Sequence, residues 1–234
     1  MSPAPDGGTG DGPVGDRSEA VESTVAEAVS AFEDGRPVLV HDAADREDEI
    51  DILQPARAVD PDAVARLRSD AGGMICVALS DGVAETLGLP FLHEAVDHPA
   101  AAVADLAYDD RPAFSLPVNH RGVRTGVTDA DRARTITALA EVAASPDEAR
   151  FAETFRVPGH VSVLRGAPDG LADRQGHTEL GLALAAAADR APAVVVCEML
   201  EDGAGARDRA AARRYADHND LPFLEGSTLI EAFR

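Results

Sequence analysis

Residues 176–198, GHTELGLALAAAADRAPAVVVCE, decide the fold. Thr178 to Ala188 consists mainly of alanine and leucine and is apolar on every side, which predicts a helix that is buried all round. Ala193 to Cys197 follows as a short run of valines, which is typical of a buried strand. A buried helix beside a buried strand needs further structure on both sides, so the segment predicts layers of helix and sheet around one core.

Helices and strands interleave along the rest of the chain, although they do not alternate strictly. Helices are expected at Ser18 to Gly35, Pro61 to Ser69, Thr128 to Ala143 and Asp208 to Asn219, and strands at Pro37 to Val40, Met74 to Leu79, Phe114 to Val118, Val161 to Leu164 and Leu221 to Leu224. This order predicts an α+β fold, a single layered α/β/α-type domain with mixed sheets over residues 18–234. Residues 1–17 are rich in glycine, proline and aspartate and lack apolar periodicity, so we expect a disordered acidic tail.

The chain carries 42 acidic residues against 21 basic ones, every one of them arginine, for a formal net charge of −21. Such a surface repels phosphate backbones, so we expect no nucleic-acid partner. An excess of acid without lysine favours a protein from a salt-rich cytoplasm, where molar salt screens the repulsion. Arginine usage in a GC-rich genome is the alternative, and both explanations stay open at this point.

Cysteine content and hydropathy bear on the location of the protein. Two cysteines are too few for a secreted disulfide framework. No apolar run approaches the roughly 20 residues of a membrane helix, and the N-terminus lacks the basic and apolar parts of a signal peptide. We therefore expect a cytoplasmic protein that has no membrane partner.

Residues 41–51, HDAADREDEID, form the first candidate site. If this stretch is extended, Asp45, Glu47, Glu49 and Asp51 share one face. Carboxylates so close together repel one another unless they are solvated or neutralised by arginine or by a hard cation. Mg²⁺ prefers oxygen ligands of this kind. A solvated acidic turn is the alternative.

The second candidate site, Arg174 to Glu179, directly precedes the buried helix. A helix N-terminus attracts anions, and an arginine can donate two parallel hydrogen bonds to a phosphate. Gly176 allows a close approach of the backbone, and Thr178 adds a hydroxyl. A neutral His177 is suited to ligate a metal beside that phosphate. The alternative is that Thr178 simply caps the helix.

Two weaker candidates lie at strand ends. Glu198 follows the strand Ala193 to Cys197, at the kind of edge where ligands gather in layered α/β proteins, and a carboxylate there can transfer protons. His160 follows Pro158 and Gly159 in a turn that leads into a strand. A surface glutamate and a structural histidine are the alternatives.

The order and spacing of these motifs are more specific than any one of them. The motifs are Asp45-Arg46-Glu47-x-Glu49-x-Asp51, Gly72-x-Met74-Ile75-Cys76, Thr125-Gly126-Val127-Thr128-x-x-Asp131-Arg132, Pro158-Gly159-His160-Val161, Arg174-x-Gly176-His177-Thr178-Glu179 and Cys197-Glu198. In this combination the chain resembles the 3,4-dihydroxy-2-butanone 4-phosphate synthases of riboflavin biosynthesis, from about Ala20 to Phe233. Its acidity favours a haloarchaeal-like member of that family, and we expect a stand-alone form because no second domain follows the matching region.

The resemblance implies an activity, a cofactor and an assembly. The activity is that of a lyase that converts D-ribulose 5-phosphate to L-3,4-dihydroxy-2-butanone 4-phosphate and formate, by metal-assisted enediolate formation, skeletal rearrangement and loss of C4. The implied cofactor is Mg²⁺, two ions per site, with Mn²⁺ as a substitute. The implied assembly is a homodimer whose site lies close to the subunit interface.

The same resemblance implies roles for single residues. Glu47 and His177 are the implied metal ligands, and His160 and Glu198 are the implied catalytic residues. The implied substrate-binding residues are Arg46, Glu47, Asp51, Arg174, Gly176, His177, Thr178 and Glu198. Asp42, Glu49 and Cys76 are candidates for a supporting role.

The chain also departs from the family pattern. Ala43 and Ala44 stand where bacterial members usually have further acids, and Ile50 stands where they usually have glycine. Residues 91–121 match poorly, so we transfer no role to them.

Two other functions remain as alternatives. A nucleotide-binding protein of the threonylcarbamoyl-adenylate synthase type needs a basic surface, which this acidic chain lacks. A non-catalytic module that captures a sugar phosphate or a divalent cation would explain Arg174 and Glu47. It gives no reason for His160 and Glu198 to accompany them.

Overall fold

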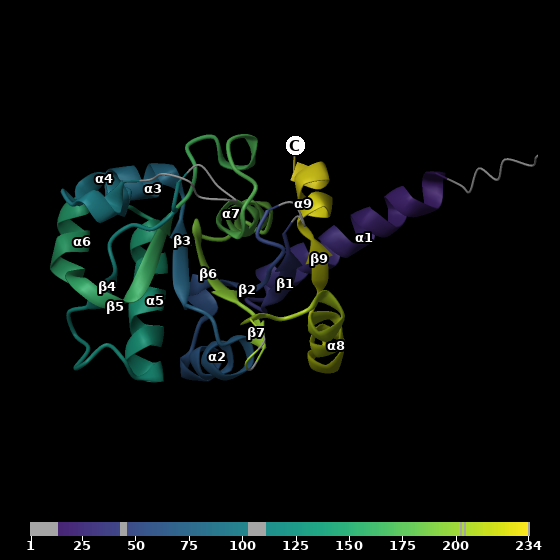
Figure 1. The fold of residues 1–234 in the computed structure, drawn as a ribbon, viewed down its shortest axis with the longest axis horizontal. Coiled ribbons are helices and arrows are strands. Elements are labelled where there is room, and N and C mark those ends of the chain that lie inside the picture. The colour runs from purple at the N-terminus through teal and green to yellow at the C-terminus, as the bar shows by residue number, and fades with distance from the viewer. Residues whose placement is uncertain (1–13, 43–45, 103–110, 202, 204, 234) are drawn as a thin grey trace, which may run out of the picture.

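A seven-stranded sheet runs through the centre of the molecule in the computed structural model, which describes residues 14–42, 46–102, 111–201, 203 and 205–233 (Figure 1). In sheet order the strands are β4 (Val118–His120), β5 (Phe155–Arg165), β3 (Cys76–Leu79), β6 (Ala193–Glu198), β2 (Ile50–Pro55), β1 (Val38–His41) and β9 (Phe223–Glu225). The pairs β1/β9 and β3/β5 are parallel, and the other neighbouring pairs are antiparallel. The sheet is therefore mixed, as predicted.

Helices cover both faces of this sheet. One face packs against α1 (Val14–Glu33), α7 (His177–Ala187) and α9 (Gly226–Phe233), and the other packs against α2 (Pro61–Arg66), α5 (Asp129–Ala143) and α8 (Arg209–Asn219). Successive strand residues alternate between the two apolar cores, since Val195 lies in one core and Val194 and Val196 lie in the other. The predicted α+β, three-layer α/β/α arrangement is confirmed.

The remaining elements are short. They are α3 (Asp81–Thr86), α4 (Leu92–Ala95), α6 (Glu148–Thr154), the helical turns Ala56–Ala58, Leu67–Ala71, Pro99–Ala101 and Gly170–Ala172, and a two-stranded ribbon of β7 (Leu200–Glu201) and β8 (Gly205–Ala206). Among the described residues, no helix is long and apolar enough to cross a membrane.

Residues 176–198 fold into a buried helix and a buried strand, as expected. In α7, Leu180, Leu184 and Ala185 are fully buried, because the helix lies between the sheet and the helices α1 and α9. Strand β6 occupies an inner position between β3 and β2 and is buried along nearly its whole length. This packing fixes the N-terminus of α7 beside the ends of β6 and β2.

Three expected boundaries differ from the structure. Helix α1 begins at Val14, so residues 14–17 belong to it and not to a tail, while residues 1–13 of the expected tail lie outside the described part of the chain. The expected strand at Phe114 to Val118 contributes only its last residue to β4, and Phe114 forms a single bridge to Leu164. Strand β5 is much longer than the expected Val161 to Leu164, because β4 pairs with its first half.

Candidate active site

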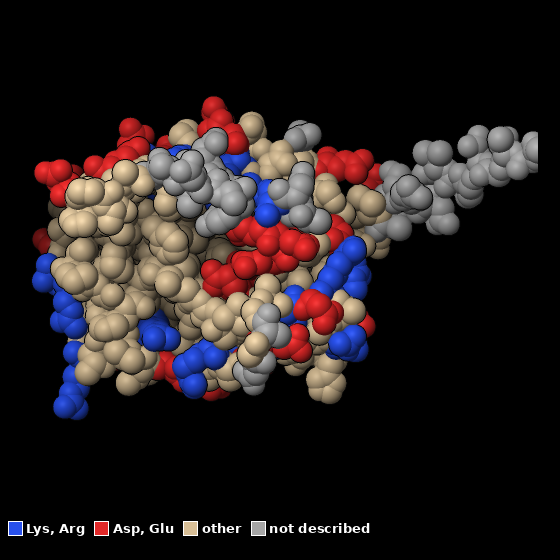
Figure 2. Space-filling model, viewed as in Figure 1, with Lys and Arg blue, Asp and Glu red and all other residues tan. Residues whose placement is uncertain are grey.

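A cavity of about 500 Å³ opens beside the N-terminus of α7 and the ends of β2, β3 and β6. Its volume lies within the roughly 300–1,000 Å³ that is usual for small-molecule sites. It is lined by Arg46, Glu47, Glu49, Asp51, Cys76, Arg111, Pro112, Ala113, Phe114, Leu164, Arg174, His177, Thr178, Val196 and Glu198. Figure 2 shows acidic side chains gathered near the middle of the face that Figure 1 presents. Most of the residues predicted from the sequence therefore lie around one cavity.

The acidic stretch forms a turn, not the extended segment that was considered from its sequence. Asp42, whose side chain is fully buried, accepts hydrogen bonds from the backbone N–H of Glu47 (3.3 Å) and of Glu49 (3.1 Å). The backbone N–H of Asp42 in turn donates to the carbonyl of Glu49 (3.1 Å). Asp45 lies outside the described residues. The turn brings Glu47, Glu49 and Asp51 to the cavity from one short loop and the start of β2.

His177 is the first residue of α7, and its ring is held by the neighbouring strand. Its Nε2 lies 3.1 Å from the carbonyl oxygen of Val40, which only accepts hydrogen bonds, so Nε2 carries the proton. Nδ1 is then directed at the carboxylates of Glu47 (3.8 Å) and Asp51 (3.6 Å). A hydrogen bond of this kind on the far nitrogen commonly orients a metal-ligating histidine.

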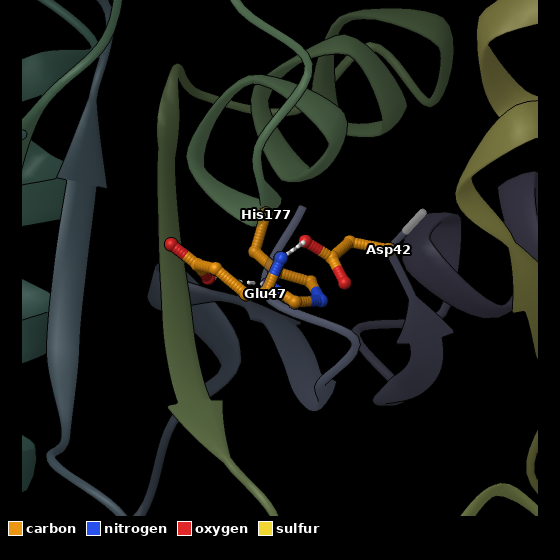
Figure 3. Close-up of side chains that lie close together, drawn as sticks. All are labelled: Asp42, Glu47 and His177. Atoms are coloured by element: carbon orange, nitrogen blue, oxygen red, sulfur yellow. Dashed lines mark hydrogen bonds and ion pairs between the residues drawn. The ribbon is translucent and has the colours of Figure 1, made fainter. Parts of the chain in front are cut away.

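Asp42, Glu47 and His177 form the candidate metal site. One ligand atom of each residue lies within 4.8 Å of the others, and Figure 3 shows the three side chains close together, Asp42 and Glu47 from the acidic turn and His177 from α7. Two carboxylates and an imidazole nitrogen suit a divalent cation such as Mg²⁺ or Mn²⁺. Asp42 was expected only to support the site, and the structure groups it with the two predicted ligands.

The electrostatics of the site favour a bound cation. Burial raises the pKa of Asp51 to about 7, although His177 opposes this shift. Burial alone would lower the pKa of His177, but the carboxylates of Asp51, Glu47 and Asp42 outweigh it and raise that pKa to about 9. Asp51 Oδ1 is buried and has no hydrogen-bond partner in the part of the chain that the structure describes. A divalent cation would neutralise this concentration of buried negative charge, so these residues fit one.

The other side of the cavity is suited to an anion. Gly176 occupies the N-cap of α7, so Thr178 lies in the first turn and does not cap the helix. A Cβ at Gly176 would come within 2.6 Å of Arg174 Nη1 and 3.1 Å of Arg46 Nη2. The missing side chain therefore leaves room for two guanidinium groups at a helix N-terminus, where an anion is favoured. Arg174 also donates to the buried carboxylate of Glu179 (2.9 Å).

Glu198 stands across the cavity at the end of β6, in register with Asp51 of β2. Its carboxylate accepts a hydrogen bond from the backbone N–H of Met74 (2.7 Å), and its carbonyl accepts one from Gly73 (3.0 Å). A Cβ at Gly73 would overlap the Glu198 side chain, so the glycine permits this close approach. Cys76 is buried beside it, and burial raises the pKa of its thiol above the ordinary value, which keeps it protonated.

His160 is the one predicted site residue that lies apart. It is exposed on β5, it contacts Asn119, and the described residues that line the cavity do not include it. Conversely, sequence reasoning missed Arg111, which lines the cavity and stacks on the ring of Phe91 at 3.7 Å. A lone arginine before a proline carries no motif, so the sequence offered no signal for it.

Comparisons with known proteins agree with this geometry. A family model described as 3,4-dihydroxy-2-butanone 4-phosphate synthase matches residues 26–232. A 3,4-dihydroxy-2-butanone 4-phosphate synthase of Archaeoglobus fulgidus is 44% identical over 224 residues, which cover 89% of this chain and 93% of that protein. One similar crystal structure is a 3,4-dihydroxy-2-butanone 4-phosphate synthase in complex with two magnesium ions, with a TM-score of 0.75, 28% identity, and coverage of 89% of this chain and 95% of that one.

A second solved structure is larger than this chain. It is a two-domain 3,4-dihydroxy-2-butanone 4-phosphate synthase from A. baumannii, with a TM-score of 0.75 and 30% identity. The alignment covers 88% of this chain and 56% of that protein, so the chain spans about half of its length. The family model, the relatives and the fold agree, and the chain belongs to the 3,4-dihydroxy-2-butanone 4-phosphate synthase family.

Proposed function

We propose that the chain converts D-ribulose 5-phosphate to L-3,4-dihydroxy-2-butanone 4-phosphate and formate, a reaction of riboflavin biosynthesis. The observation that carries this proposal is that Glu47 Oε2 and His177 Nδ1 lie 3.8 Å apart in the same cavity as the N-terminus of α7. A phosphorylated sugar needs an anion site and a site for its oxygens, and this cavity provides both. Membership of the family supports the same assignment.

The phosphate binds at the N-terminus of α7. Arg174 and Thr178 donate to it from the helix side, and Arg46 approaches from the acidic turn. Glu179 holds the Arg174 guanidinium in place, because its buried carboxylate accepts from that arginine and from the backbone of Ala167 (3.0 Å). Binding of the phosphate at this position therefore determines where the sugar carbons lie relative to the carboxylates.

Glu47 and His177 hold the divalent cations, with Asp42 beside them. We infer two Mg²⁺ ions per site, with Mn²⁺ as a substitute, and the related structure that contains two magnesium ions supports this number. When bound, such a cation polarises the carbonyl and hydroxyl oxygens of the sugar, so that the proton on the adjacent carbon becomes more acidic. Asp51 and Arg46 hold the remaining polar groups of the substrate.

Proton transfer falls to the carboxylates that face the sugar. The backbone N–H of Met74 fixes the Glu198 carboxylate in the cavity. Burial, together with the charges of Glu47 and Glu198, raises the pKa of Glu49, so Glu49 accepts protons more readily than an ordinary glutamate. Glu198 is our candidate catalytic residue, and Glu49 supports it.

A homodimer accounts for the position of His160. Because His160 is exposed and lies outside the cavity of its own chain, we infer that it serves the site of a second copy. Large apolar side chains are exposed along the same strand: Val157 belongs to β5, Met74 contacts Ser162, and Phe114 bridges to Leu164. A second copy of the chain would cover these side chains.

The two alternative functions are not favoured. Nucleotide or RNA binding conflicts with a net charge of −21 and with the family to which the chain belongs. A non-catalytic module would not need Glu198 and Glu49 beside the metal ligands, yet both line the cavity. A cytoplasmic location and a domain that spans residues 18–234 remain our predictions.

Formate release tests the proposal. The protein is incubated with ribulose 5-phosphate and Mg²⁺ in molar KCl, and formate is measured. We expect formate in these conditions, none after EDTA, and none with Glu47→Gln. Glu141→Gln is the matched control, because Glu141 pairs with Arg57 on the surface (2.8 Å), and it should keep full activity. Absence of formate from the wild type with both Mg²⁺ and Mn²⁺ would refute the proposal.

A further inference from the structure

The side chain of Asn119 is buried next to His160, in an irregular part of the sheet. Asn119 lies on β4, where the register with β5 shifts between Val118 and Asn119, and residues 157–160 bulge out of the ladder. Gly126, at φ +84°, packs so closely that a Cβ there would overlap the Asn119 amide. The amide is therefore confined on both sides, and its contacts with His160 are built into the fold.

Two contacts determine which way the amide points. The backbone N–H of His160 donates to Asn119 Oδ1 (2.9 Å), and a backbone N–H cannot accept. On the opposite side, Asn119 Nδ2 faces the carbonyl oxygen of Thr125 (3.5 Å), which cannot donate. Oxygen and nitrogen of an asparagine amide are easily interchanged in a structure. Here both contacts require Oδ1 on the His160 side and Nδ2 on the Thr125 side, so the amide cannot be flipped.

The orientation of the amide then determines the protonation of the His160 ring. Asn119 Nδ2 lies 3.0 Å from His160 Nδ1. The amide nitrogen only donates, so Nδ1 must present its lone pair, and the proton of the neutral ring lies on Nε2.

We propose that Asn119 is a positioning residue that fixes His160 as the neutral tautomer with its proton on Nε2. This inference rests on the proposed function, in which His160 serves the active site of a second copy of the chain. His160 then presents a hydrogen-bond donor to a substrate oxygen that gains negative charge during the reaction, and it does not present a base. The implied catalytic role of His160 is then to stabilise the charge on that oxygen.

Nitrogen NMR of the histidine rings tests this directly. The chain has seven histidines, so ¹⁵N-histidine labelling gives a short spectrum, and His160→Gln assigns the His160 signals by subtraction. In the wild-type holoenzyme we expect a protonated Nε2 and a bare Nδ1. In Asn119→Asp, the new carboxylate oxygen still accepts from the His160 backbone but faces Nδ1 as an acceptor, so the proton should move to Nδ1.

Kinetics show whether the tautomer matters. For Asn119→Asp we expect kcat to fall by about 100-fold, the typical effect of losing one such donor, while KM for ribulose 5-phosphate stays within about twofold. Asn219→Asp adds the same charge at the exposed end of α8 and should change neither spectrum nor rate.

The outcomes separate the inference from the proposed function. A neutral wild-type His160 ring that carries its proton on Nδ1 overturns the inference, and this measurement needs no variant. A tautomer switch in Asn119→Asp without loss of kcat overturns it as well. If His160→Gln also keeps full activity while the wild type has the Nε2 proton, the role of His160 in the proposed function is what fails.

Discussion

Replacing Gly176 by alanine should disturb the proposed phosphate site without straining the backbone. Gly176 has ordinary extended backbone angles, φ −85° and ψ 172°, so alanine adds no backbone strain. The added Cβ would lie 2.6 Å from Arg174 Nη1 and 3.0 Å from its Cζ. These atoms are the far end of a flexible side chain, so the guanidinium can move aside, but it then leaves the position in which it binds phosphate and weakens its ion pair with the buried carboxylate of Glu179.

The size of the effect follows from the bonds that are lost. A hydrogen bond to a charged group contributes about 1.5–3 kcal/mol, and each 1.4 kcal/mol corresponds to about a tenfold change in affinity. We therefore expect Gly176→Ala to raise KM for ribulose 5-phosphate by about 10- to 100-fold, with a smaller change in kcat, and to lower Tm as far as the Arg174–Glu179 ion pair is weakened. Formate release gives the kinetic constants, and differential scanning calorimetry gives Tm.

A matched control makes the result specific. Gly82 in α3 has no atom within 4 Å of the position of an added Cβ, so Gly82→Ala should leave KM unchanged, and because alanine favours a helix it should not lower Tm. Inorganic phosphate, used as a competitive inhibitor, should lose affinity for Gly176→Ala to the same extent as the substrate. An unchanged KM in Gly176→Ala would refute the assignment of this helix terminus as the phosphate site.

Three further predictions concern protonation, stability and salt. Burial opposes the charge of His177, but the surrounding carboxylates hold its pKa near 9, so the metal-free ring is protonated at neutral pH. Binding of Mn²⁺ should therefore strengthen as pH rises and release about one proton from the ring. Calorimetry in buffers of different ionisation enthalpy counts this proton, and pH-independent binding would contradict the prediction. Burial raises the pKa of Glu225, yet hydrogen bonds from His41, Arg209 and Arg213 lower it overall, so its stabilising effect is present above the pKa of an unfolded glutamate and is lost as pH falls through the lower folded value. Glu225→Gln should therefore cost about 1–3 kcal/mol in urea unfolding at pH 7 and less at acid pH, whereas an equal loss at both pH values would count against this network. If the net charge of −21 reflects a salt-rich host, Tm should rise steadily between 0.1 and 2 M KCl. Over this range the screening length falls from about 10 Å to about 2–3 Å, which weakens the repulsion between acidic side chains. A Tm that does not change with KCl would favour a bias in composition instead.

Local sequence was sufficient for the elements that are buried on all sides. The helix that became α7 is apolar all round, and the strand that became β6 consists mostly of valine, so only one kind of environment suits either of them. The segment that became β4 was harder. Phe114 to Val118 looks like a strand by composition, but the pairing partner, β5, reaches Val118–His120 through an irregular register that no local pattern encodes.

The residues of the site likewise fall into those that a local motif predicts and those that only the tertiary structure reveals. Arg174, His177 and Thr178 were predictable because they are neighbours at one helix N-terminus, and their chemistry is visible in a short motif. Arg111 reaches the cavity from a segment without a motif, so only the tertiary structure reveals it. The position of His160 outside the cavity of its own chain depends on how β4 and β5 pair, which sequence spacing does not contain.

The acidic turn illustrates a third case. Its carboxylates were expected to share a face because the stretch alternates, yet they meet at the cavity because Asp42 closes a turn on the backbone of Glu47 and Glu49. Glu47, Glu49 and Asp51 do line one cavity, whereas Asp45 lies outside the described residues, and the physical reason differs from the expected one. Hydrogen bonds from a buried aspartate to backbone N–H groups are a tertiary feature that alternation cannot indicate.

The most direct measurement is a crystal of this protein soaked with Mn²⁺ and examined by anomalous diffraction. We expect an anomalous peak between Glu47 and His177 Nδ1, within about 2.0–2.5 Å of the ligating atoms and on the side of the cavity next to the α7 N-terminus. A peak elsewhere in the cavity with neither of these side chains as a ligand would contradict it.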